Sequence, residues 1–147
     1  MRPLRQQGFS LIEVLVAVLI VSVGILGVAG LQLVSLQNNT SALLRTQAFQ
    51  AAYDIIDRAR ANPDGDYAIA MDDDAPAAVD CEGGACTAAQ MRNYDVNTWL
   101  TTVAADLPLG DGEFVVNGNT ITVTIRWQDE RNPGGTLDLA VSTTFGG

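Results

Sequence analysis

The sequence contains no histidine and no lysine, and only two of its 147 residues are cysteines. A structural zinc site needs about four nitrogen or sulfur ligands, so two thiols without a histidine cannot complete one. There is also no recognisable nucleophile motif and no pair of carboxylates at a catalytic spacing. The sequence therefore favours a structural or binding protein over an enzyme, and it predicts no catalytic residue, no cofactor and no metal site.

Positive charge is scarce as well. The chain has 8 basic residues against 17 acidic ones, which gives a formal net charge of −9 at pH 7. A surface that binds nucleic acid needs a basic patch or stripe to neutralise phosphates, and the sequence has no such cluster. We therefore expect no nucleic-acid partner. The acidity suits a solvated domain outside the cytoplasm.

No proline interrupts the chain between Phe9 and Asn62, so a single helix can run through this stretch. From Val14 to Leu31 there are 18 residues whose only polar side chain is Ser22, about the length that a bilayer-spanning helix needs. Glu13 stands at the start of the apolar run, where a carboxylate is costly and usually functional. The first half of the helix is therefore predicted to span a membrane.

The residues before the apolar run indicate how this helix is oriented and processed. Arg2 and Arg5 precede it and a long acidic chain follows, which predicts a cytoplasmic N-terminus and a head outside the inner membrane. An ordinary secretory signal is cut after its apolar run, whereas the plausible processing site here, Gly8, comes before it. The hydrophobic helix would then stay on the mature protein, and loss of the two arginines would take the net charge from −9 to −11.

Beyond residue 36 the helix becomes amphipathic, and it is predicted to stop at Asn62-Pro63-Asp64-Gly65. Residues at spacings of three and four fall on one face: Leu44, Ala48, Ala51, Ala52, Ile55 and Ala59. In the membrane half, Gly24, Gly27 and Gly30 either allow close helix packing or mark a point where the helix melts on assembly. The sequence leaves both explanations open.

Residues 63–86 have the composition of an acidic loop. Its carboxylates could bind calcium, but their spacing matches no EF-hand, and a charge run is more often simply solvated. The loop ends in Cys81-Glu-Gly-Gly-Ala-Cys86, whose two glycines let the chain fold back. We predict a Cys81–Cys86 disulfide, which fits an oxidising compartment and shapes the loop locally.

After the loop, Thr87 and Asp95 are predicted helix N-caps, the second one opening a helix that buries Trp99 and ends at Pro108. After Pro108, the spacing between apolar residues falls to two, which is typical of strands. Val115 and Val116 lead into the hairpin signal Asn117-Gly118-Asn119, and alternating strands follow at 120–127 and 137–145. We expect an α+β fold in which the long helix packs on a small three-stranded antiparallel sheet.

The N-terminal stretch Gly8, Phe9, Ser10, Leu11, Ile12 and Glu13 resembles the class III signal of type IV pilins and pseudopilins at every position. The resemblance implies that a prepilin peptidase cleaves between Gly8 and Phe9 and that the new amino terminus on Phe9 is methylated. It also implies that Glu13 docks the subunit against the amino terminus of a neighbour. The fold expected from it is the pilin ladle.

Later segments are similar to the PilV family of minor pilins, the type IV pilus modification proteins. They are Asp57-Arg58-Ala59-Arg60-Ala61-Asn62, Tyr94-Asp95 before Trp99, and Ala104-Ala105-Asp106-Leu107-Pro108. This resemblance implies a low-abundance subunit that primes pilus assembly with other minor pilins, the major pilin, a tip adhesin and the inner-membrane assembly platform, and so bears on adhesion and twitching motility. The subunit would start in the inner membrane and end in the pilus, near its tip.

These features divide the chain into five predicted segments: a leader (1–8), a transmembrane and assembly half-helix (9–36), an amphipathic half-helix (37–62), an acidic loop with the disulfide and a short helix (63–112), and the antiparallel sheet (113–147). Two other functions stay open. A minor pseudopilin of a type II secretion system would have the same leader and architecture. A pilin that binds DNA or adheres to another ligand is a second alternative, although the acidity counts against DNA.

Overall fold

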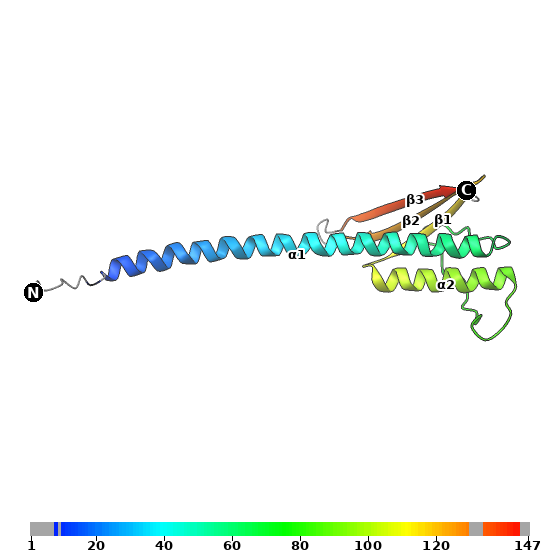
Figure 1. The fold of residues 1–147 in the computed structure, drawn as a ribbon, viewed down its shortest axis with the longest axis horizontal. Helices are drawn as coiled ribbons and strands as arrows, with labels where there is room; N and C mark the ends of the chain where they lie inside the picture. The colour runs from blue at the N-terminus through cyan, green and yellow to red at the C-terminus, as the bar shows by residue number, and fades with distance from the viewer. Residues whose placement is uncertain (1–7, 9, 130–133, 145–147) are drawn as a thin grey trace, which may run out of the picture. The chain divides into compact units, whose positions relative to one another are not determined.

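The computed structural model of the chain describes residues 8, 10–129 and 134–144 (Figure 1). It contains helices α1 (Leu11–Ala61) and α2 (Ala88–Asp106) and strands β1 (Asp111–Asn117), β2 (Thr120–Gln128) and β3 (Thr136–Thr144). The chain forms two compact units, residues 1–39 and 40–147, and α1 contributes to both. We call residues 40–147 the head.

The N-terminal unit consists of the start of α1. The Ser10 hydroxyl and carbonyl oxygens both accept from the backbone amide of Glu13, which closes the first turn of the helix. Every residue of α1 up to Asn39 is exposed, and by length and composition the helix can cross a membrane. A Cβ added at Gly24, Gly27 or Gly30 would meet no atom within 4 Å, so no contact within the described chain requires glycine there.

In the head, α1 buries the face that its sequence pattern predicts. The buried residues recur at spacings of three and four: Ser41, Leu44, Ala48, Ala52, Ile55, Ile56 and Ala59. The helix ends at Ala61, where the Asn62 amide still bonds back to the Arg58 carbonyl at 3.1 Å, and Pro63 cannot continue the ladder. The predicted stop before Pro63 is confirmed.

The sheet is antiparallel with the order β1-β2-β3, and the predicted hairpin joins β1 to β2. Asn117 pairs with Thr120, and Gly118 adopts a φ of 61°, a conformation that glycine reaches without strain. β1 starts at Asp111, two residues before the predicted sheet segment (113–147), and an isolated bridge joins its Phe114 to Ile69. The predicted extension of β3 to Phe145 lies outside the described residues.

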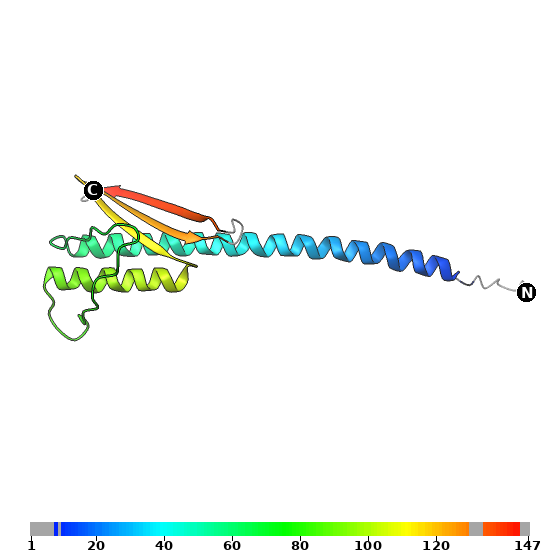
Figure 2. The ribbon, with the colours of Figure 1, turned by 180° about the vertical axis from the view of Figure 1, so that it is seen from behind.

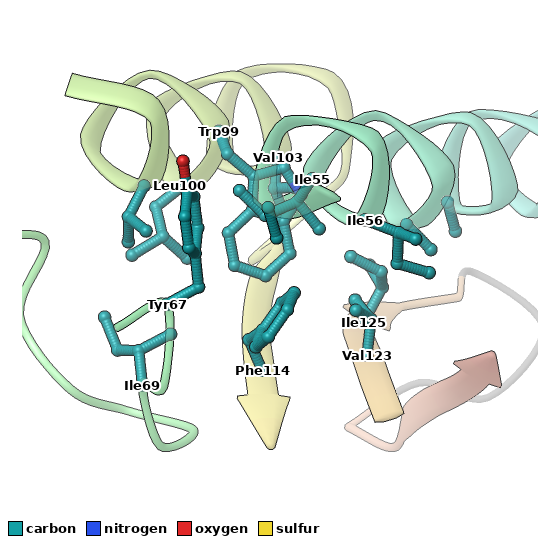
Figure 3. Packing of buried hydrophobic residues seen from close by; sticks show 14 of the residues in the cluster. Ile55, Ile56, Tyr67, Ile69, Trp99, Leu100, Val103, Phe114, Val123 and Ile125 are labelled. Carbon is teal, nitrogen blue, oxygen red and sulfur yellow. The ribbon is translucent and has the colours of Figure 1, made fainter. Parts of the chain in front are cut away.

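The core of the head joins both helices, the sheet and the chain between the helices (Figure 3). Ile55 and Ile56 of α1 belong to this core together with Val123 and Ile125 of β2, and every one of these four side chains is at most 1% exposed. Alternate residues of β2 are buried throughout the strand, which is the pattern of a sheet with one covered face. The predicted α+β fold, a long apolar N-terminal helix packed on a small three-stranded antiparallel sheet, is confirmed.

One predicted helix boundary is wrong. Thr87 is the N-cap of α2 and forms a capping box with Gln90, as its sequence position suggested. Asp95, however, is not a second cap, because α2 continues through it without a break for 19 residues. No glycine or proline interrupts the chain from Ala88 to Asp106, and the Asp95 carboxylate is bound by other side chains instead of by backbone amides.

Candidate functional site

The residues of the N-terminal signal lie at the start of the described chain. Gly8 is exposed, and Phe9, the predicted site of cleavage and methylation, lies outside the described residues. Glu13 is in the first turn of α1 and is exposed. Among the described residues, the Glu13 carboxylate has no hydrogen-bonding or ionic partner. Its charge is therefore available to another molecule.

A second group of polar residues, which we call the corner network, lies where α1 ends: Arg58, Asn62, Tyr67 and Asp95. The Tyr67 hydroxyl donates to Asp95 Oδ2 at 2.5 Å, and the Arg58 guanidinium donates to Asp95 Oδ1 at 3.1 Å. The side-chain amide of Asn62 donates to the Tyr67 hydroxyl oxygen at 3.2 Å and to the Ala88 carbonyl at 2.9 Å. Each oxygen of the Asp95 carboxylate thus has its own donor.

Two residues of the corner network are buried, so their polar groups depend on hydrogen bonds within the protein. The Asp95 residue is 5% exposed and Tyr67 is 2% exposed. An ionised carboxylate at this depth is costly unless it is paired and hydrogen-bonded, and Arg58 and Tyr67 meet both conditions. Burial, together with the hydrogen bond to Asp95, raises the pKa of Tyr67 to about 12. Burial lowers the pKa of Arg58, but its bonds to Asp54 and Asp95 outweigh that effect and leave the pKa raised.

The corner network joins three parts of the head that are far apart in sequence. Arg58 and Asn62 come from the end of α1, Tyr67 from the connection after it, and Asp95 from the middle of α2. Arg92 of α2 adds two bonds to the same connection, donating to the carbonyls of Asp66 and Ala68. Because these polar groups bind one another, we interpret the corner network as a structural element that holds the end of α1, the connection after it and α2 together.

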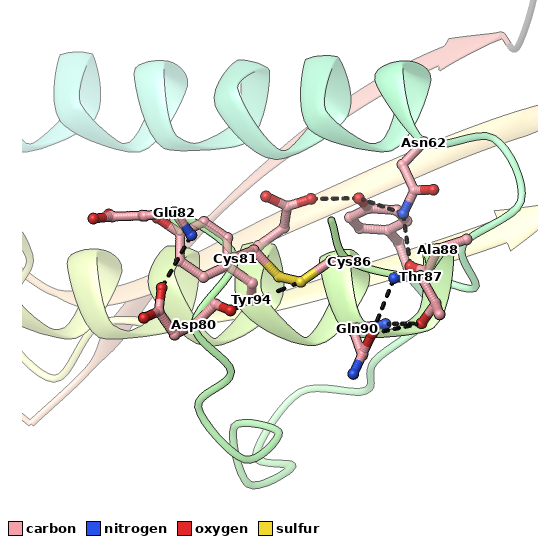
Figure 4. The surroundings of a disulfide bond; sticks show 11 residues. Asn62, Asp80, Cys81, Glu82, Cys86, Thr87, Ala88, Gln90 and Tyr94 are labelled. Carbon is pink, nitrogen blue, oxygen red and sulfur yellow. Dashed lines mark hydrogen bonds between the residues drawn. A yellow bond between two sulfur atoms is a disulfide. The ribbon is translucent and has the colours of Figure 1, made fainter. Parts of the chain in front are cut away.

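The structure contains the predicted Cys81–Cys86 disulfide, with the two Cα atoms 5.8 Å apart (Figure 4). The loop that it closes is attached to α2. Tyr94 donates to the Glu82 carboxylate at 3.0 Å, and the Asn97 amide donates to the Pro76 carbonyl at 2.7 Å. The acidic segment is therefore held against α2 at two points, Pro76 and Glu82.

The acidic side chains of this segment are used mainly in its own turns. Asp66, Asp73 and Asp80 each accept from a backbone amide two or three residues away. Asp72 has a φ of 66° and accepts from Arg126 of β2 at 3.4 Å. Within the part of the chain that the structure describes, no group of three or more metal-ligating side chains comes together. The carboxylates thus act as turn and ion-pair partners here.

The sequence pattern did not reveal the corner network, although it drew attention to two of its parts. Arg58 and Asn62 belong to the segment Asp57–Asn62, and Asp95 belongs to Tyr94-Asp95, both of which carried the family resemblance. Tyr67 had no such signal. A second buried pair was also missed: the Ser41 hydroxyl donates to Asp129 at 2.7 Å, and both residues are nearly inaccessible to solvent.

Comparison with known families supports a pilin. Residues 3–29 match the prokaryotic N-terminal methylation motif, and residues 30–97 match the family of the type IV pilin Tt1218. The two ranges adjoin, and together they include the N-terminal signal, α1, the acidic loop and the first half of α2. Neither range reaches the sheet. No curated protein and no solved structure matches the chain.

The raised pKa of Tyr67 predicts a specific loss of stability in alkali. An unfolded tyrosine ionises near pH 10.0, whereas Tyr67 in the folded head ionises near pH 12, so the unfolded state loses its proton first. The contribution of Tyr67 is complete below pH 10 and disappears as the pH rises to 12. Urea unfolding followed by the fluorescence of the two buried tryptophans should show this decline, and Tyr67→Phe should reduce it.

The control is Tyr53→Phe, because Tyr53 is exposed and lies outside the corner network. This variant should keep the pH dependence of the original chain between pH 10 and 12. If Tyr67→Phe and Tyr53→Phe lose stability in parallel over this range, the hydrogen-bonded phenol does not have the role assigned to it.

Proposed function

We propose that this protein is a minor pilin of the PilV type, a structural subunit that primes assembly of a type IV pilus. A prepilin peptidase removes residues 1–8, and the new amino terminus on Phe9 is methylated. The subunit waits in the inner membrane with its head outside, and then enters the fibre together with other minor pilins. The type IV pilin family is structural, which agrees with the absence of a nucleophile motif.

One observation supports this proposal above the others. The first unit is a helix whose side chains are all exposed up to residue 39, with a methylation motif at its start and a single carboxylate, Glu13, in its first turn. A fully exposed apolar helix of this length needs lipid or other helices around it. A membrane before assembly and a bundle of pilin helices after it supply these two environments.

Glu13 is the proposed docking residue. A favourable interaction with the helix dipole contributes at most about 1 kcal/mol, whereas a carboxylate in hydrocarbon costs about 3 kcal/mol on insertion scales. The dipole cannot offset that cost, but an opposite charge can. Cleavage creates one such charge nearby, the amine of Phe9, and the same amine exists on neighbouring pilins. We propose that Glu13 pairs with the Phe9 amine of an adjacent subunit.

Deletion of the gene tests the function directly. We expect loss of surface pili, and we expect the gene supplied in trans to restore them. Co-purification should then identify the partners, which are expected to be other minor pilins, the major pilin, the tip adhesin and the assembly platform. Normal pili together with a block in type II secretion would instead identify a minor pseudopilin. Normal pili and normal secretion would refute the assembly role.

Processing provides a second test. Glycine leaves the scissile backbone unobstructed, so the mature protein should begin at methylated Phe9 in N-terminal mass analysis. Gly8→Val should leave the longer form in the inner membrane, because the branched side chain blocks the peptidase. Gly83→Val, a glycine in the disulfide loop with open space around it, is the control and should be processed normally. An intact Met1 on the mature protein would contradict the proposal.

The docking role of Glu13 gives a third test. Glu13→Val should be cleaved, methylated and inserted normally, because the apolar helix is unchanged. It should fail to co-purify with partner pilins and should lower piliation at least about tenfold, the loss expected for one ion pair of a few kcal/mol. Ser22→Val is the matched control, since it removes a polar group from the same helix without removing a charge. Full piliation in Glu13→Val would refute the ion pair.

A further inference from the structure

We infer that the free edge of β3 accepts an extended strand from a neighbouring pilin of a different kind, which adds to the sheet as a fourth strand. The inference rests on the proposed function as a pilin. β3 is an edge strand of nine residues, and no described element of the head lies along its outer side (Figures 1 and 2). The backbone groups of β3 that point outward determine what can pair with this edge.

The bridge at the opposite edge fixes the direction of every backbone group in the sheet. Phe114 of β1 exchanges two hydrogen bonds with Ile69, at 2.9 and 3.1 Å. In an antiparallel sheet the N–H and C=O of one residue point to the same side. Those of Phe114 therefore point away from β2, and those of Val123, its partner across β2, point toward β3.

Val123 lies opposite Val141, so Val141 bonds to β2 and its sequence neighbours point the other way. The register continues through nine pairs without a bulge, so the alternation holds along the whole strand. Residues whose backbone N–H and C=O face outward are Thr136, Asp138, Ala140, Ser142 and Thr144. Within the described chain, none of these groups makes a backbone hydrogen bond outside the sheet.

The two edges of the sheet differ in how they are protected. At β1 the bridge to Ile69 covers Phe114, and the outward amide of Gly112 donates to the Asp111 side chain at 2.7 Å. Natural proteins usually protect an edge with lysine, proline, a bulge or a covering element. β3 has none of these among the residues that the structure describes. Its one charge, Asp138, is paired with Arg126 of β2 at 3.1 Å, which leaves a long and regular edge with little net charge.

The side chains beside this edge suit a neighbouring strand. Thr136, Ala140, Ser142 and Thr144 are small and exposed, so a strand can approach the backbone closely, and threonine and serine form favourable cross-strand pairs. A second copy of the chain is disfavoured because each copy carries a formal net charge of −9, or −11 after cleavage, and two such acidic chains repel. The strand that fits is therefore a neutral or basic one from a different pilin.

Ala140→Pro tests whether the outward backbone N–H groups of β3 bind a neighbouring strand. Proline removes only the outward N–H of residue 140, and its ring obstructs the edge. The adjacent backbone bonds that hold β3 to β2 belong to Leu139 and Val141, so they stay in place, and such a proline is tolerated on an edge strand. Ala140→Thr is the matched control, since it keeps the N–H and has a good strand propensity. Both substitutions are made in the full-length chain in the cells that produce it.

The readout is a photo-crosslinker at Ser142, on the exposed face of β3. An added strand lies about 4.8 Å from β3 but about twice that distance from β2, so a crosslinker at Thr122, which faces Ser142 from β2, is the distance control. We expect a crosslinked adduct with another pilin from position 142. Ala140→Pro should lower the adduct yield about tenfold, because it removes a hydrogen bond and its ring obstructs the edge, whereas Ala140→Thr should keep the yield.

Unchanged fluorescence of the two buried tryptophans, Trp99 and Trp127, shows that the purified Ala140→Pro variant has folded. If it has not, Ala140→Lys replaces it, because lysine protects an edge without removing an N–H. Equal adducts in the edge variants and Ala140→Thr, adducts only between copies of this chain, or no adduct from Ser142 would each overturn the inference. Loss of pili on gene deletion with full rescue by Ala140→Pro would refute strand addition alone, whereas normal pili and secretion on deletion would refute the proposed function.

Discussion

The packing of the two helices in the head is organised around one buried carboxylate, that of Asp95. Without Arg58 and Tyr67 it would be an unpaired buried charge, which costs several kcal/mol. The two donors come from the end of α1 and from the connection that follows, so pairing them fixes α1 and α2 in one arrangement. Two residues beyond Tyr67, Ile69 then reaches Phe114 and sets the position of β1. The hairpin and β3 follow from that strand by local pairing.

Sequence patterns predicted the elements that depend on local information. Strict alternation gave β2, Asn117-Gly118 gave the hairpin, and Pro63 gave the end of α1. Asp95 was assigned the wrong role because aspartate suits both a helix cap and a buried ion pair. Its partners lie 28 and 37 residues away, and no local pattern identifies contacts at that separation. The start of β1 was placed too late because its first residues, Asp111 and Gly112, have low strand propensity.

The candidate sites show the same division. The signal around Gly8 and Glu13 can be read from its residues because, in the proposed function, a peptidase recognises it as a linear segment. The partner of the Glu13 carboxylate could not be found in one chain, because the proposed partner is the amine of another subunit. The outward direction of the backbone N–H and C=O groups of β3 could not be predicted from the sequence either, because it follows from the bridge between Ile69 and Phe114. Alternation predicts which side chains are buried but not which side of a strand its amides face.

In the proposed assembly, the apolar surface of α1 and the edge of β3 have different roles. The apolar side chains of α1 up to residue 39 gain most by leaving water, and lipid or neighbouring helices satisfy them almost equally well. The backbone of β3 is satisfied by water until a strand replaces it, so each new hydrogen bond adds only about 1 kcal/mol net. Those bonds form only with an extended strand in one register. The helix therefore retains the subunit in an apolar environment, whereas the edge of β3 determines which neighbour it accepts and in what position.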